Sequence, residues 1–121
     1  MGLNLDALDE DTRSKIMNLN NLQQTLEFLT SQKVQTETNL QEGQLAVEEL
    51  EKLAEDAVVY KSIGGLMVKG DRNKILDEKK SENVTMEMRL KTLDSKINRT
   101  RQNLQNLQKS IQAELQKKQQ A

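Results

Sequence analysis

The side chains that could do chemistry in this chain are carboxylates, lysines, arginines, hydroxyls and amides, because it contains no cysteine and no histidine. Without those two residue types there is no thiol or imidazole nucleophile, no zinc site of the usual kind and no disulfide framework. Carboxylates alone can act as acid and base only in a concave pocket that positions a substrate. The adjacent pair Gly64 and Gly65 lies outside any phosphate-binding motif of the G-x-x-x-x-G-K type. We therefore expect no catalytic residues, no metal, no cofactor and no enzyme activity.

Apolar side chains remain as a means of binding, and their spacing is regular. The chain is 35% hydrophobic and 31% charged and has only two aromatic residues, Phe28 and Tyr60, which is poor material for a globular core. Apolar residues recur at alternating spacings of three and four from Leu19 to Ala57 and from Leu76 to Ile111, as in a coiled-coil seam. No proline interrupts them. The pattern predicts two long helices, at about residues 10–57 and 71–118.

The segment between these tracts favours strands. Val58–Ile63 and Leu66–Lys69 are rich in β-branched and apolar residues, and the two glycines between them suit a two-residue hairpin turn. We therefore predict a β-hairpin at 58–69, with Asp71 as the N-cap of the second helix. A two-residue turn places one set of side chains on a single face: Val59, Lys61, Ile63, Leu66 and Val68.

A chain reversal at the hairpin makes the two helices an antiparallel pair. The expected register places Leu29 opposite Leu104 and Val47 opposite Met86. Charge favours the same pairing, since residues 1–57 carry 4 basic and 12 acidic side chains (net −8) and residues 58–121 carry 14 basic and 7 acidic (net +7). Each exposed ion pair contributes only a few tenths of a kcal/mol. We interpret the asymmetry as partner selection between the two helices.

Two regions of this fold leave apolar surface uncovered. Neither helix is expected to cover the hairpin, and an isolated hairpin is marginal in water, so Val58–Lys69 is predicted to assemble with hairpins of other subunits into a shared sheet or barrel. The alternative is an irregular loop that caps a monomeric coiled coil. Near the free ends, off-seam apolar residues should be partly exposed and could bind apolar segments, although single exposed apolar residues are also common. These off-seam residues are Ile16, Met17, Phe28 and Leu115.

Other kinds of partner are not expected. From Ser95 onward there are six basic residues and one acidic residue, but no aromatic side chain that could stack on a base. A solvated face beside the acidic helix accounts for this charge, so we expect no nucleic acid. No apolar stretch approaches the roughly 20 residues of a membrane span, and the acidic segment Met1–Asp11 differs from a basic signal-peptide start. We expect no membrane partner and a soluble, cytoplasmic protein.

The central segment resembles the hairpin of the β-type subunit of prefoldin. The resemblance is carried by residues 57–69, which read AVVYKSIGGLMVK and are close to the family's VYK…G…(L/I)VK signature. Heptad tracts of the expected length flank this signature, and the likeness covers about residues 10–118. A single hairpin resembles the β type, because α-type subunits carry two. The departures from the family pattern are Gly65, Gly43 and the extension Met1–Asp11.

The resemblance implies a mostly α fold, in which a long antiparallel two-helix coiled coil is joined by a single β-hairpin. The chain would form one prefoldin β-type domain over residues 1–121, within a hexamer of two α-type and four β-type subunits. The hairpins would form a β-barrel between subunits, with Val59, Ile63, Leu66 and Val68 as assembly contacts.

The resemblance also implies a function, that of an ATP-independent chaperone. Such a subunit would hold unfolded or nascent client proteins at the coiled-coil tips and pass them to a group II chaperonin. The client contacts that it implies are Ile16, Met17, Leu19, Leu22, Leu107, Ile111 and Leu115. The residues alone leave one alternative, a structural coiled-coil tether or spacer whose ends bind one folded partner.

Overall fold

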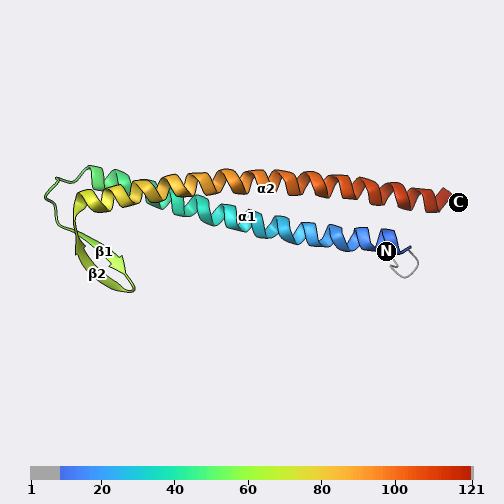
Figure 1. The fold of residues 1–121 in the computed structure, drawn as a ribbon, viewed down its shortest axis with the longest axis horizontal. Helices are drawn as coiled ribbons and strands as arrows, with labels where there is room; N and C mark the ends of the chain where they lie inside the picture. Colours follow the sequence, from blue (N-terminus) through green and yellow to red (C-terminus); the bar gives the residue numbers. More distant parts are fainter. Residues whose placement is uncertain (1–8, 121) are drawn as a thin grey trace. The chain divides into compact units, whose positions relative to one another are not determined.

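Two long helices joined by a hairpin make up the fold. The structure, a computed structural model, describes residues 9–120, with side chains up to Lys117. Its elements are α1 (Glu10–Glu51), β1 (Val59–Ile63), β2 (Leu66–Gly70) and α2 (Arg72–Gln120) (Figure 1). The expected mostly α fold with a single hairpin is thereby confirmed. The first eight residues of the acidic segment Met1–Asp11 lie outside the described residues.

The chain divides into two compact units. The terminal unit joins the described parts of residues 1–32 and 93–121, and the hairpin unit comprises residues 33–92. In each unit a part of α1 packs against a part of α2. In the terminal unit, Lys15 near the start of α1 contacts Ser110 in the later part of α2, whereas in the hairpin unit Leu50 at the end of α1 packs with Ile75 at the start of α2. The pairing is therefore antiparallel.

Aspartates cap the N-termini of both helices. At α1, the backbone N–H of Thr12 donates to Asp9 Oδ1 at 2.8 Å, and Glu10 and Asp11 add negative charge to the first turn. At α2, the backbone N–H of Asn73 donates to Asp71 Oδ1 at 3.2 Å. The expected N-cap at Asp71 is confirmed.

The α1 helix ends at Glu51, six residues before the expected end at Ala57. The guanidinium of Arg72, at the start of α2, explains this early end. Its Nε donates to the carbonyl oxygen of Leu50 at 3.0 Å and its Nη2 to that of Glu51 at 3.2 Å. The last carbonyl groups of a helix lack hydrogen-bond donors from a following turn. A cationic side chain that donates to them supplies those hydrogen bonds, so the helix can end there. Residues 52–58 form the connection to β1.

The hairpin has the expected turn and face. Ile63 pairs with Leu66 and Val59 pairs with Gly70, which leaves a two-residue turn at Gly64 and Gly65. Both glycines have positive φ, 53° and 82°, a conformation that other residues adopt at a cost. Because directly paired residues of an antiparallel ladder share a face, the five residues predicted to lie together do so: Val59, Lys61, Ile63, Leu66 and Val68.

Buried seam residues form a separate cluster in each unit. In the terminal unit Leu29, Leu93 and Ile97 are buried together, and Leu26 packs against them. In the hairpin unit the cluster consists of Leu50, Ile75 and Leu76, and two partly buried residues, Val47 and Val59, pack against it. Heptad periodicity therefore identified the seam correctly.

The expected register of the two helices is wrong. Leu29 was expected opposite Leu104 but packs with Leu93 and Ile97. Val47 was expected opposite Met86 but packs with Ile75 and Leu76. Ile97 precedes Leu104 by seven residues, which is one heptad. A shift of one heptad keeps all seam positions aligned, so periodicity does not distinguish the two registers. The segments that connect the helices to the hairpin select the register. Seven residues (52–58) separate α1 from β1, whereas only Asp71 separates β2 from α2.

Candidate functional site

Two pockets lie on the surface of the terminal unit, between α1 and α2. The first has a volume of about 570 Å³, and both helices line it: Asn18, Asn21, Leu22 and Thr25 from α1, and Asn103, Asn106, Leu107 and Ser110 from α2. The second has a volume of about 300 Å³ and is lined by Leu19, Gln108, Ile111 and Gln112. Four of the seven predicted client contacts thus line pockets in this unit: Leu19, Leu22, Leu107 and Ile111.

The other three predicted client contacts lie off the seam. Ile16 and Leu115 are half-buried, whereas the Met17 side chain is 60% exposed. Phe28, which was expected to be partly exposed, is 62% exposed. The terminal unit therefore presents apolar side chains both in its pockets and on its outer surface.

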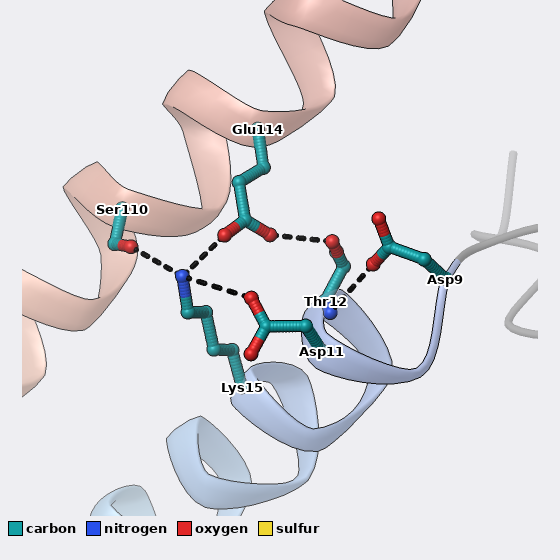
Figure 2. Close-up of polar contacts among 6 residues, drawn as sticks. All are labelled: Asp9, Asp11, Thr12, Lys15, Ser110 and Glu114. Carbon is teal, nitrogen blue, oxygen red and sulfur yellow. Dashed lines mark hydrogen bonds and ion pairs between the residues drawn. The ribbon is translucent and has the colours of Figure 1, made fainter.

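A polar network joins the first turns of α1 to the last turns of α2 (Figure 2). Thr12 is fully buried, and its hydroxyl donates to Glu114 Oε2. Lys15 Nζ forms an ion pair with Glu114, donates to Ser110 Oγ at 3.0 Å and lies 3.5 Å from Asp11 Oδ2. The network fastens the two helices beside the apolar residues Ile111 and Leu115.

The pKa values in this network favour its charged form. The hydrogen bond from Lys15, followed by that from Thr12, lowers the pKa of Glu114 below its ordinary value. The hydrogen bond to Glu114 raises the pKa of Lys15 in turn, against a smaller opposing effect of burial. The sequence offered one signal for this site, an acid (Glu114) at a seam position where an apolar residue is usual. The expected charge asymmetry did not predict it, because here the base lies on α1 and the acid on α2.

The hairpin is the second surface rich in exposed apolar side chains. Of the 13 large hydrophobic residues that are well exposed among the described residues, six lie between residues 58 and 68. Ile63 is 52% exposed, Leu66 70% and Val68 45%. The six are Val58, Tyr60, Ile63, Leu66, Met67 and Val68.

The expectation that neither helix covers the hairpin is wrong at its base. Val59 is half-buried against the cluster of Leu50, Ile75 and Leu76. Lys61 Nζ forms an ion pair with Glu78 Oε2 of α2 at 2.9 Å, and its hydrogen bond lowers the pKa of Glu78 and raises that of Lys61. Of the four predicted assembly residues, Ile63, Leu66 and Val68 are thus left open, whereas Val59 partly belongs to the core.

Two other kinds of site are not found in the described part of the chain. Neither helix is apolar over a length that could cross a membrane. No group of three acidic side chains is arranged to hold a metal ion.

Comparison with known proteins shows the family to which this chain belongs. A family model described as "Prefoldin subunit" matches residues 13–118. Prefoldin subunit beta of Pyrococcus furiosus is 38% identical over 97 residues, which cover 80% of this chain and 83% of that protein. Prefoldin subunit beta of Thermococcus gammatolerans is 38% identical over 111 residues, 92% of this chain and 95% of that protein. The chain therefore belongs to the prefoldin subunit family, and its resemblance to the β type is confirmed.

A solved structure agrees with these relatives. The crystal structure of the prefoldin beta subunit from Thermococcus strain KS-1 superposes with a TM-score of 0.77 at 33% sequence identity. The match covers 88% of this chain and 94% of that chain. The agreement in fold therefore extends over most of the chain.

Proposed function

We propose that this chain is a subunit of an ATP-independent cytoplasmic chaperone that holds unfolded or nascent proteins. Apolar segments of a client bury against the terminal units of several subunits, and each contact is weak. Several weak contacts on one assembly raise the overall affinity through effective concentration. Release needs only competition at the same surfaces, as on docking to a group II chaperonin. Holding of this kind requires no catalytic residue and no nucleotide.

The observation that carries this proposal is the apolar surface of the terminal unit. Met17 and Phe28 are more than half exposed, and leucines line the pockets between the helices. Burying one such side chain in an interface is worth about 1.5–3 kcal/mol. A structural tether would need only the surface that contacts its one folded partner, and no further exposed apolar side chains.

The proposal includes assembly through the hairpin. Exposed apolar side chains and free strand edges favour pairing with the hairpins of other subunits, which buries both at once. The partners proposed are two α-type subunits and three further copies of the β type. Ile63, Leu66 and Val68 then serve as the principal contacts, and Val59 supports them from the core.

Aggregation of a denatured protein tests the holding function. The chain is assembled with an α-type prefoldin subunit and mixed with an unrelated chemically denatured enzyme, and light scattering is followed on dilution. We expect suppression at near-stoichiometric ratios without nucleotide. In the variant Met17→Ser/Phe28→Ser, the concentration needed for half suppression should rise roughly tenfold, because apolar contact area is lost.

A matched variant controls for general loss of apolar surface. Leu45→Ser/Met88→Ser also removes one large apolar side chain from each of two exposed helix positions, at 58% and 64% exposure, but within the hairpin unit. It should suppress aggregation as well as the unchanged chain does. If the unchanged assembly leaves aggregation unaffected, the holding function is wrong and a tether becomes the better explanation.

A further inference from the structure

The larger pocket of the terminal unit is lined by the same short motif on both helices. Residues 18–25 read NLNNLQQT and residues 103–110 read NLQNLQKS, identical at five of eight positions. The pocket-lining positions of each motif are the first, fourth, fifth and eighth. These positions share one face of a helix. Two antiparallel helices that present the same face to one pocket are related by a local two-fold axis.

The chemistry of this pocket is that of the peptide group. Four asparagines surround two leucines, and each asparagine amide offers both N–H donors and an oxygen acceptor. In the described part of the chain, none of the four side-chain amides forms a hydrogen bond with another protein group. The two hydroxyls are already engaged, because that of Thr25 donates to the carbonyl oxygen of Asn21 at 2.9 Å and that of Ser110 accepts from Lys15.

Among the residues that the structure describes, no charged side chain lines the pocket. Such a lining carries no preference for the charge of a ligand. An amide lining around an apolar floor instead matches a chain that exposes free main-chain N–H and C=O groups beside apolar side chains. A folded protein has already paired these groups, whereas a non-native chain has not.

We propose that this pocket binds the main chain of an extended, uncharged polypeptide segment through the amides of Asn18, Asn21, Asn103 and Asn106, and that it accepts the segment in either direction. The leucines Leu22 and Leu107 take up apolar side chains between the amide contacts. The local two-fold axis makes the two directions of the segment nearly equivalent. This inference rests on the proposed holding function and gives it a means of recognising non-native chains without reading their sequence.

Peptide probes with and without main-chain donors test the inference. The first probe is a fluorescein-labelled ten-residue peptide of leucines and serines in which the leucines are unevenly spaced, so that its reversed sequence is a different peptide. The second is the same peptide N-methylated at every other amide. The third has the reversed sequence, and binding to the full-length chain is followed by fluorescence anisotropy. We expect the N-methylated peptide to bind roughly tenfold more weakly than the parent, and the reversed peptide to bind within about threefold of it.

Substitution of the asparagines separates amide recognition from apolar burial. Asn21→Leu/Asn106→Leu keeps the size of the side chains but removes the amides, and it should bind the parent peptide roughly tenfold more weakly and lose the distinction from the N-methylated peptide. Asn20→Leu/Asn98→Leu is the matched control, because both asparagines are exposed on the same two helices but do not line the pocket. This control should bind like the unchanged chain.

Three outcomes overturn the inference. The unchanged chain could bind the parent and N-methylated peptides alike, or the Asn21→Leu/Asn106→Leu variant could bind the parent more tightly, as a simply apolar pocket would. A strong preference for one peptide direction would overturn the two-fold part. Aggregation assays on the same preparations separate this failure from that of the proposed function, because the chain can suppress aggregation without distinguishing the peptides. If it does neither, both proposals fall.

Discussion

At the scale of single residues, the ion pair between Lys15 and Glu114 makes the terminal unit sensitive to acid. The pKa of Glu114 is lowered in the folded chain, so its ionised form stabilises the fold above the ordinary glutamate pKa. This contribution is lost as the pH falls through the lowered value. The raised pKa of Lys15 acts at high pH. The protonated form of Lys15 stabilises the fold below the ordinary lysine pKa, and this contribution is lost as the pH rises through the raised pKa.

Amide hydrogen exchange checks this pH dependence. We expect the protection factors of residues 12–19 to fall between pH 7 and pH 3, and to be already low at pH 7 in Glu114→Gln. The control Glu27→Gln removes an exposed carboxylate of the same unit and should behave like the unchanged chain. Equal pH profiles for Glu114→Gln and the unchanged chain would contradict the assignment.

At the scale of elements, the end of α1 depends on Arg72. Arg72→Met removes two charge-assisted hydrogen bonds to the carbonyls of Leu50 and Glu51. Their loss should lower the free energy of unfolding by roughly 1–2 kcal/mol, as measured by urea denaturation followed by circular dichroism. Arg72→Lys should recover only part of it, because an ammonium lacks the planar fork of donors. Arg89→Met, an exposed position on α2, is the control, and a loss of equal size there would refute the capping role.

The elements also show which parts of the fold could be predicted from the sequence. The seam, the turn at Gly64 and Gly65 and the cap at Asp71 are set by residues near one another in the chain, and all three were predicted. The end of α1 and the helix register were not, because Arg72 acts on α1 from α2 and a one-heptad shift leaves the periodicity unchanged.

The candidate site, too, could be predicted only in part. The apolar residues of the terminal unit follow from the heptads, and four of them line its pockets. The Lys15–Glu114 network could not be predicted, because it depends on the correct register. The asparagine pocket did carry a signal, the motif repeated at residues 18–25 and 103–110, but its meaning depends on the two copies meeting across the helix pair. The need for glycine at position 43 likewise depends on the helix pairing, because an added Cβ there would collide with the side-chain oxygen of Asn83.

At the scale of the whole molecule, assembly should depend on the outer part of the hairpin. Ile63→Asp/Leu66→Asp places charge at two side chains that are 52% and 70% exposed. The two helices of the isolated chain should remain folded, as measured by circular dichroism. Assembly with an α-type subunit should be lost, because charges would have to be buried between strands without partners. Native mass spectrometry measures this directly.

A second variant shows whether the effect belongs to the hairpin. Val34→Asp/Val84→Asp introduces the same charges at exposed apolar positions of α1 and α2, at 59% and 56% exposure. It should still assemble with the α-type subunit. A hexamer that survives Ile63→Asp/Leu66→Asp would mean that the hairpin is only a bend, and a monomer or dimer of the unchanged chain with its partner would mean the same.

The distance along the chain between paired residues also constrains the order in which the molecule can form. Arg72 and Leu50 are 22 residues apart, whereas Thr12 and Glu114 are 102 residues apart. The entropy lost in closing a loop grows with its length, so contacts beside the hairpin are the cheapest to make first. Each helical turn of α1 that pairs with α2 near the hairpin shortens the loop that the next pair of turns must close. Pairing can therefore proceed stepwise from the hairpin toward the helix ends. We therefore expect the polar network at Thr12 and Glu114 to be the last contact to close in folding and the first to open.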